Sequence, residues 1–250
     1  MIVLPSDHYV EGEQEFINTI NEAVEVASKK RGLVTIGITP TRAETGYGYI
    51  QTGEKIAIGE NNYRVERFLE KPNVEVVRDL LSLGNYVWNS GIFVWRADSY
   101  LREMEKYLPK MYKSLSTIYQ NLETDEEEKI IREQYEQIEG ISVDFGILQK
   151  TRKGYVVKSN FIWDDIGNFI SLARFLEKKG ANLIRGEAFL EQSENCYVFG
   201  KDKLLIGFGI KDLIIVDSGD ILLIMDKNKD QEIKSLVDSI KYTPHLKEYM

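Results

Sequence analysis

Residues 2–8 read Ile2-Val3-Leu4-Pro5-Ser6-Asp7-His8, an apolar run that ends in a polar loop. A run of this kind is typical of a buried parallel strand, because strands covered on both faces lack polar alternation. Apolar residues at helical spacing follow between Phe16 and Ala27, Gly32 acts as a stop, and residues 33–38 form a second apolar run. Strand, helix and strand in this order predict a parallel α/β sheet.

The rest of the chain continues this mixture of strands and helices. Short runs indicate further strands at residues 47–50, 63–69, 86–95, 155–157, 161–163, 196–199, 204–208, 213–216 and 221–225. Helical periodicity is found at residues 74–83, 99–150, 168–179 and 233–240. Gly53 and Gly59 are interpreted as turn residues, and the acidic run at residues 125–128 as an exposed helix start.

Composition excludes several classes of protein. The chain has 250 residues, 43% of them hydrophobic, and a net charge of -8, with no basic cluster of the kind that binds nucleic acid. No run approaches the roughly 20 apolar residues of a membrane span. The single cysteine, Cys196, is interpreted as a small buried residue, and it favours a reducing, cytoplasmic compartment. The two histidines, His8 and His245, are too far apart in sequence to suggest a histidine-rich metal site.

Asp7 follows the first apolar run directly, so it should project from the carboxyl end of a strand. That edge of an open α/β sheet is where ligands bind, and a carboxylate is a suitable ligand for a hard cation. Aspartate is also a favoured helix N-cap, here for a segment that would begin near Val10. Both interpretations of Asp7 stay open at this point.

Asp164 and Asp165 are a second group of acids at a strand end. A single acid in this position would be a helix cap. Two acids at separate strand ends of one sheet favour a magnesium site, because Mg²⁺ takes one or two carboxylates together with substrate phosphates. Spacing alone does not bring Asp7 and this second group together.

Glycines flank a tyrosine in Thr45-Gly46-Tyr47-Gly48-Tyr49. Glycine allows a ligand to approach the backbone closely, although an ordinary turn into a strand also explains the pattern. No Gly-Lys-Ser/Thr sequence follows, so this stretch is not a phosphate-binding P-loop.

Glu70-Lys71-Pro72 ends a predicted strand, since Pro72 stops strand pairing. Neighbouring side chains of an extended chain point to opposite sides. Glu70 could therefore accept hydrogen bonds from sugar hydroxyls while Lys71 meets a phosphate. Two solvated charges at a strand end are the simpler alternative.

Trp88-Asn89-Ser90-Gly91 places polar residues inside an apolar strand. A buried amide needs hydrogen-bond partners, and a sugar is a plausible one for Asn89. Asp144, in Ser142-Val143-Asp144-Phe145, falls in the first turn of a predicted helix. Capping and the helix dipole are sufficient to explain an acid at that position.

Six motifs occur in a fixed order along the chain: residues 4–8, 45–50, 70–72, 88–93, 142–144 and 163–167. Their joint order resembles the mannose-1-phosphate guanylyltransferase family of sugar-1-phosphate nucleotidyltransferases, from Ile2 to about Gly167. The resemblance implies transfer of GMP from GTP to mannose 1-phosphate, which gives GDP-mannose and pyrophosphate. The fold it implies is α/β, with a Rossmann-like (GT-A-like) mixed sheet followed by a small C-terminal β-rich, β-helix-like segment.

The resemblance also assigns residues. It implies that Asp7 and Asp165 hold Mg²⁺, or Mn²⁺, and that Lys71 faces the sugar phosphate, so that Asp7, Lys71 and Asp165 form the catalytic set. The residues it implies for the sugar site are Gly48, Glu70, Lys71, Asn89, Gly91 and, more weakly, Asp144. Asp164 is a further weak candidate for an indirect or sugar contact.

One part of the family pattern has no counterpart in these 250 residues. The family carries a glycine-rich loop with an arginine around the triphosphate, and no Gly-x-Gly-x-Arg stretch is present. We therefore expect residues 1–180 to form a partial catalytic domain without its first βα units, and residues 181–250 a β-rich segment with a terminal helix. The chain alone is expected to be inactive, and residues 2–4 to form an apolar sheet edge.

Two rival functions stay open. One is a nucleotidyltransferase that acts on glucose 1-phosphate with UTP or dTTP. The other is a non-catalytic subunit that binds a sugar nucleotide and partners a complete enzyme. The resemblance further implies a homodimer formed through the β-rich segment.

Overall fold

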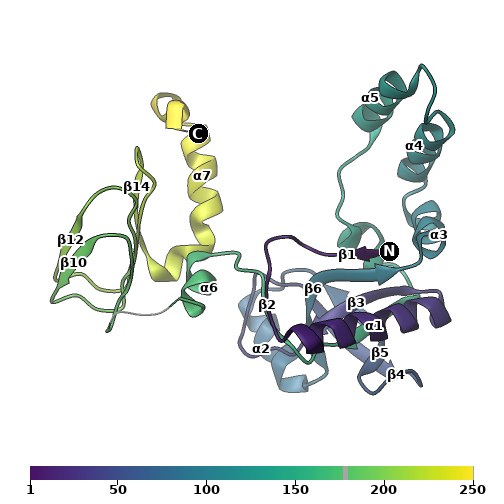
Figure 1. Cartoon of the computed structure of the whole chain (residues 1–250), viewed down its shortest axis with the longest axis horizontal. Helices are drawn as coiled ribbons and strands as arrows, with labels where there is room; N and C mark the ends of the chain where they lie inside the picture. The colour runs from purple at the N-terminus through teal and green to yellow at the C-terminus, as the bar shows by residue number, and fades with distance from the viewer. Residues whose placement is uncertain (177–179, 250) are drawn as a thin grey trace. The chain divides into compact units, whose positions relative to one another are not determined.

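The computed structural model describes residues 1–176 and 180–249. The chain divides into two compact units, Met1–Trp163 and Asp164–Met250, and each is described by itself (Figure 1). The domain boundary expected at residue 180 stays a prediction.

A six-stranded sheet forms the centre of the first unit, in the order β1-β6-β3-β7-β5-β4, with a further pairing of β6 with β4. β3 runs antiparallel to β6 and parallel to β7. The sheet is therefore mixed, which confirms the α/β fold implied by the resemblance. β2 and β8 pair separately. The strands are β1 (Ile2–Val3), β2 (Tyr9–Glu11), β3 (Leu33–Ile38), β4 (Tyr49–Lys55), β5 (Asn62–Leu69), β6 (Tyr86–Trp95), β7 (Gly154–Lys158) and β8 (Ile162–Asp164).

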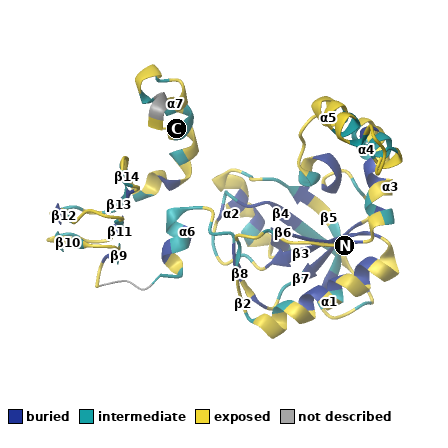
Figure 2. Cartoon of the chain, turned by 45° about the horizontal axis from the view of Figure 1, so that its top comes forward, coloured by how far each residue is buried: buried dark blue, intermediate teal, exposed yellow. Residues whose placement is uncertain are grey.

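Hydrophobic cores cover both faces of this sheet, because successive strand residues point to opposite faces. Val34 and Ile36 of β3 pack in one core with Val26 of helix α1, whereas Leu33 packs in the other core with Met104 of α3. Figure 2 shows the dark blue of buried residues concentrated in the strands. The helical segments are α1 (Glu13–Lys30), α2 (Val74–Leu83), α3 (Ala97–Tyr107), α4 (Pro109–Gln120), α5 (Glu127–Gln137) and the π-helical turn η1 (Asp144–Leu148).

The prediction that residues 2–4 form a buried parallel strand is wrong. β1 pairs antiparallel with β6, and Ile2, Val3 and Leu4 are 46%, 38% and 50% exposed. The reason is that β1 is the outermost strand of the sheet and, among the described strands, pairs with β6 alone. The apolar edge expected at these residues is thus present.

Other strand and helix boundaries differ in detail. Gly53, expected in a turn, lies inside β4, whereas Gly59 has a φ of 65° and does form a turn. The helix predicted at residues 168–179 is shorter, because α6 covers Phe169–Arg174. Residues 177–179 of that prediction lie outside the described residues. The helices predicted at residues 74–83 and 233–240 are confirmed as α2 and α7 (Ile233–Lys241).

The second unit winds its strands between two small sheets. β9 (Leu183–Arg185), β11 (Tyr197–Phe199) and β13 (Leu213–Asp217) pair in parallel, as do β10 (Ala188–Glu191) and β12 (Leu205–Phe208). Because the chain visits the two sheets alternately, each pass adds one turn to a coil, which confirms the β-helix-like segment. β9 and β10 were not predicted from the sequence.

The core of this coil is a stack of residues in register. Leu183, Tyr197 and Ile214 lie opposite one another on neighbouring strands and share one hydrophobic cluster. Cys196, which directly precedes Tyr197, is buried, as predicted. β14 (Leu222–Asp226) then pairs antiparallel with β13 and leads through η2 (Lys227–Glu232) to α7 and η3 (Pro244–Tyr249).

None of the helices in residues 1–176 and 180–249 is both long enough and apolar enough to cross a membrane.

Candidate functional site

Gly48 lies where the turn before β4 passes close to two other segments. A Cβ atom at this position would be 2.8 Å from Glu70 Oε2 and 3.4 Å from Asn89 Cβ. The Asn89 backbone N–H also donates to the Gly48 carbonyl oxygen at 2.8 Å. The glycine is therefore required by close approach within the protein, and it brings the turn, the end of β5 and β6 together.

Asn89 occupies an irregular point of β6. The register with β3 shifts between Thr35 and Gly37, and Gly91 has a φ of 71°, a region that favours glycine. The Asn89 amide donates to Asp144 Oδ1 at 3.1 Å and accepts from the Thr35 hydroxyl at 2.9 Å. Asp144 and Thr35 thus take up part of the hydrogen-bonding capacity of the Asn89 amide, for which the sequence suggested a sugar partner. They also fix the orientation of the amide.

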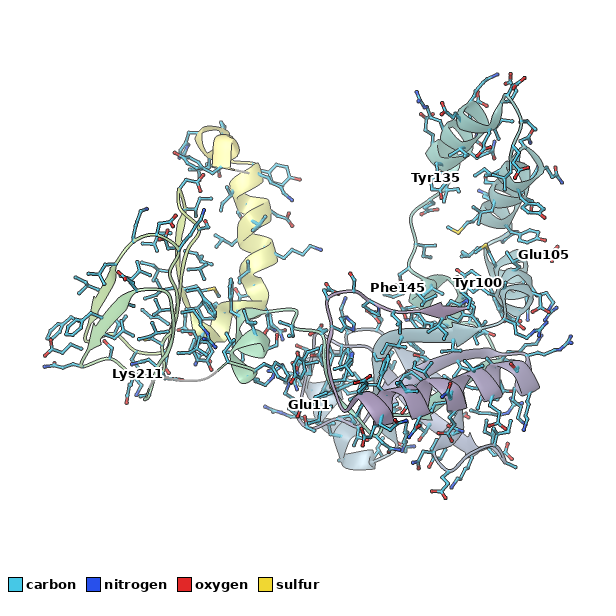
Figure 3. All side chains as sticks on the ribbon, in the orientation of Figure 1. Glu11, Tyr100, Glu105, Tyr135, Phe145 and Lys211 are labelled. Carbon is cyan, nitrogen blue, oxygen red and sulfur yellow. The ribbon has the colours of Figure 1, made fainter. Side chains whose placement is uncertain are left out.

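Asp144 begins the π-helical turn η1, a form often found at functional sites. The expected cap is not present, since the N-cap residue is Val143, which makes no side-chain cap hydrogen bond, and the Asp144 carboxylate accepts from Asn89. Burial raises the pKa of Asp144, and the negative charge of Glu70 raises it further, against the opposing effects of its own backbone N–H, the Asn89 hydrogen bond and Lys71. Phe145, which follows it in η1, is 48% exposed (Figure 3).

Glu70 and Lys71 do not point to opposite sides as the sequence suggested. Lys71 Nζ lies 3.3 Å from Glu70 Oε1. The cause is local, because β5 ends at Leu69 and Lys71 has a φ of 45°, so the chain is no longer extended there. The Lys71 side chain is 64% exposed and that of Glu70 is 15% exposed. An ion pair of this exposure contributes little, so Lys71 can exchange it for a phosphate.

The first unit thus brings together five of the predicted site residues: Gly48, Glu70, Lys71, Asn89 and Asp144. They come from the turn before β4, the end of β5, the middle of β6 and the start of η1. The group combines carboxylates, an amide and a cation, which suits a polyhydroxylated, phosphorylated ligand.

Asp7 lies on the exposed loop between β1 and β2. The N-cap alternative is wrong, because Val10 is part of β2 and α1 begins at Glu13 with Gly12 as its N-cap. Gly91 borders this loop, since a Cβ there would be 3.6 Å from Pro5 Cγ. The irregular part of β6 therefore contacts the Asp7 loop.

Asp164 and Asp165 have different surroundings. Asp164 is buried, and it accepts from Arg174 at 2.6 Å and from the Ile166 backbone N–H at 3.0 Å. This pairing argues against Asp164 as a direct ligand. Asp165 Oδ1 accepts from the Gly167 N–H at 2.9 Å. Neither acid caps α6, whose N-cap is Asn168.

A hard cation fits the donor chemistry of Asp7 and Asp165, since both offer carboxylate oxygens. Asp7 belongs to the first unit and Asp165 to the second, so their joint role stays a prediction. No group of three or more His, Cys, Asp or Glu side chains in the described part of the chain is arranged to hold a metal.

Sequence reasoning missed an arginine next to the site. Arg42 lies over the Trp88 ring at 4.9 Å and donates to the Tyr47 hydroxyl at 3.1 Å and to Glu44 at 3.2 Å. Glu44 in turn accepts from the Gly46 N–H at 3.1 Å, so the pair shapes the turn that leads to Gly48. The signal available in the sequence was the position of Arg42 just after the strand at residues 33–38.

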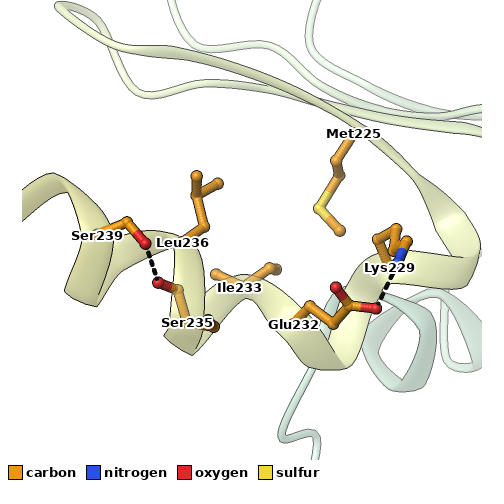
Figure 4. Close-up of a pocket in the computed structure, with 7 residues that line it drawn as sticks. All are labelled: Met225, Lys229, Glu232, Ile233, Ser235, Leu236 and Ser239. Atoms are coloured by element: carbon orange, nitrogen blue, oxygen red, sulfur yellow. Dashed lines mark hydrogen bonds and ion pairs between the residues drawn. The ribbon is translucent and has the colours of Figure 1, made fainter.

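A pocket of about 270 Å³ lies in the second unit, between Met225 at the end of β14 and α7 (Figure 4). Ile233 and Leu236 line it together with the ion-paired Lys229 and Glu232. None of the predicted site residues lines this pocket.

Comparison with known proteins assigns the chain to a family. A model described as nucleotidyl transferase matches residues 1–181, and the chain belongs to this family. A second model, described as MannoseP isomerase/GMP-like beta-helix domain, matches residues 186–240, in the coil of the second unit.

Within that family, the chain is similar to mannose-1-phosphate guanylyltransferases. The one from Salmonella montevideo is 36% identical over 246 residues, which cover 96% of this chain and 52% of that protein. The one from Escherichia coli K12 is 34% identical, with 96% and 51% covered. The chain thus spans about half the length of these relatives.

A solved structure described as mannose-1-phosphate geranyltransferase from Thermus thermophilus has the same fold. It superposes with a TM-score of 0.82 at 28% identity, over 96% of this chain and 69% of that one. This likeness extends over both units of the chain.

Proposed function

We propose that this chain carries the sugar-phosphate and metal part of a mannose-1-phosphate guanylyltransferase. The observation that carries the proposal is the convergence of Gly48, Glu70, Lys71, Asn89 and Asp144 in the first unit. The names of the relatives supply the identity of the reaction, which is transfer of GMP from GTP to mannose 1-phosphate.

The reaction needs positioning more than covalent chemistry. An oxygen of the mannose 1-phosphate attacks the α-phosphorus of GTP, a new P–O bond forms, and the bond to pyrophosphate breaks. In this proposal Glu70, Asn89 and Asp144 hydrogen-bond the sugar hydroxyls, Gly48 lets Glu70 and Asn89 come close to each other, and Gly91 lines the sugar site. Lys71 leaves Glu70 and pairs with the sugar phosphate, which holds the nucleophile in place.

Asp7 and Asp165 would hold Mg²⁺, or Mn²⁺, through their carboxylate oxygens. When bound, the ion supplies positive charge beside the phosphates. Asp164 supports this arrangement indirectly, because its pairing with Arg174 fixes the backbone next to Asp165. A cytoplasmic location is also proposed, and the buried, free Cys196 supports it.

Calorimetry on the 250-residue chain tests the proposed sugar site. Mannose 1-phosphate is expected to bind in the presence of Mg²⁺, and glucose 1-phosphate is expected to bind more weakly. The reason is that Glu70, Asn89 and Asp144 favour one orientation of the sugar hydroxyls to which they hydrogen-bond. Asn89→Ala should weaken mannose 1-phosphate binding by about tenfold, since the amide also orients Asp144. Tighter binding of glucose 1-phosphate would instead support the rival substrate, and no binding of either sugar phosphate would contradict the proposal.

We further propose a homodimer formed through the second unit. Ile206 and Phe208 alternate along β12 and therefore share a face, and Phe189 of β10 lies opposite Ile206 in register. Ile206, Phe208 and Phe189 are 72%, 65% and 58% exposed. An exposed apolar face of this kind supports burial against a second copy.

A further inference from the structure

A hydrogen bond joins two segments that are far apart in the sequence. The indole N–H of Trp163 donates to Nδ1 of His8 at 3.1 Å. The two rings meet edge to face, with centroids 5.2 Å apart and planes at 80°. His8 directly follows Asp7, and Trp163 stands two residues before Asp165.

The donor is held firmly. Trp163 is buried, with 6% of its surface exposed. Its ring lies edge-on to Tyr47 at 5.2 Å, and Tyr47 contacts Trp88 in the same way at 5.1 Å. Aromatic contacts of this kind restrict ring orientation, so the position of the indole N–H is determined by the core.

The backbone strengthens the connection. β2 begins immediately after His8, β8 contains Trp163, and these two strands pair with each other. Phe161, one residue before β8, packs against Phe16 of α1 with ring centroids 5.3 Å apart. The segment that carries His8 and the segment that carries Trp163 are therefore joined by both a strand pairing and a side-chain hydrogen bond.

We propose that Trp163 and His8 are positioning residues that hold the loop of Asp7 for metal binding. The inference rests on the proposed function, in which Asp7 is a metal ligand. The hydrogen bond fixes the backbone next to Asp7 against an indole ring that is buried in the core of the first unit, and neither His8 nor Trp163 contacts the ion in this role. Loss of groups that orient metal ligands lowers metal affinity by about 10- to 100-fold.

The test compares Mn²⁺ binding with sugar-phosphate binding in the same variants. Trp163→Phe removes the N–H and keeps an aromatic ring. We expect the Mn²⁺ affinity, followed by electron paramagnetic resonance, to fall about tenfold. The affinity for mannose 1-phosphate measured in EDTA should stay within about twofold of the wild type, because the hydrogen bond does not include Glu70, Asn89 or Asp144.

Two further variants separate positioning from folding. Trp95→Phe is the matched control, because Trp95 is also buried and its indole N–H has no hydrogen-bond partner among the described residues. It should leave Mn²⁺ affinity unchanged. His8→Leu should repeat the loss seen for Trp163→Phe, whereas His8→Asn keeps an acceptor near the Nδ1 position and should restore most of the affinity.

The outcomes distinguish this inference from the function on which it rests. If the wild type binds Mn²⁺ and Trp163→Phe binds it equally well, the positioning role is wrong and the metal site stands. Equal losses of metal and sugar-phosphate affinity would show a general effect on the fold and also overturn the role. If the wild type binds no Mn²⁺, the proposed metal site fails, and this inference fails with it.

Discussion

At Gly48 a single hydrogen atom in place of a side chain allows three segments to meet. Glu70 and Asn89 are within 3.4 Å of the position a Cβ would take. The neighbouring residues are similarly constrained, because Asn89 is fixed by Thr35 and Asp144. Individual residues in this part of the first unit therefore have little freedom to change without an effect on ligand binding.

Gly48→Ala should weaken mannose 1-phosphate binding by about tenfold, because the new methyl group displaces the Glu70 carboxylate and removes a charge-assisted hydrogen bond. Calorimetry on the purified variant measures this effect. Gly140→Ala is the matched control, since a Cβ at Gly140 has no atom within 4 Å. If the Gly48→Ala variant binds mannose 1-phosphate with unchanged affinity, Glu70 does not belong to the sugar site.

Asp144 gives a pH-dependent prediction. Its pKa is raised in the folded state, which means that the folded protein holds the proton of Asp144 more tightly than the unfolded chain. This stabilisation is fully present below the unfolded pKa, and it is lost as pH rises through the folded pKa. Asp144→Asn keeps the acceptor for Asn89 and has no carboxylate to ionise. The variant should therefore gain stability relative to the wild type as pH rises from about 3 to 7, as measured by urea unfolding.

Asp98 supplies a control of opposite sign. Hydrogen bonding to Arg96 lowers the pKa of Asp98, so Asp98→Asn should lose stability relative to the wild type as pH rises over the same range. Parallel pH profiles for the two variants would contradict the assignment of a raised pKa to Asp144.

Among the secondary-structure elements, α2 shows how local sequence determines boundaries. The Asn73 side chain accepts from the Val76 N–H at 3.0 Å, and Gly84 closes the helix with a φ of 70°. Asn73→Ala should lower the free energy of unfolding by about 1 kcal/mol, whereas Asn73→Asp keeps the cap and should change it little. Chemical denaturation of both variants provides the measurement, and equal losses would show that the cap contributes nothing.

Elements with a strong local pattern were predicted well from sequence. α2, β3 and β6 match their predicted residues because periodicity and stop signals agree there. β1 was misjudged because an apolar run does not reveal how many neighbours a strand has. β9 and β10 were missed because each is only three or four residues long and forms by pairing with a later strand of the coil.

The candidate site was predicted in part. Gly48, Glu70, Lys71, Asn89 and Asp144 were singled out from motif order, and they do lie together. Their actual partners could not be foreseen, since the Asn89–Asp144 hydrogen bond spans 55 residues of sequence. The pairing of Lys71 with Glu70 depends on a left-handed backbone conformation that no sequence pattern signals.

At the scale of the whole molecule, the proposed dimer depends on the exposed apolar face of β10 and β12. Ile206→Lys should convert dimer to monomer in light scattering after size exclusion, because a charge would be buried in an apolar contact. Ile224→Lys is the control, since Ile224 is 58% exposed on β14, in the other sheet of the unit. A dimer that survives Ile206→Lys would exclude the face of β10 and β12 as the interface.

The central place of β3 has a consequence for amide hydrogen exchange. All six of its residues are buried, and it pairs with β6 on one side and β7 on the other, whereas α5 contains no buried residue. Amides of α5 should therefore exchange with deuterium through local fraying, while those of β3 should exchange only when the first unit unfolds as a whole. Mass spectrometry of deuterium uptake should place these two segments at opposite ends of the protection scale within the first unit.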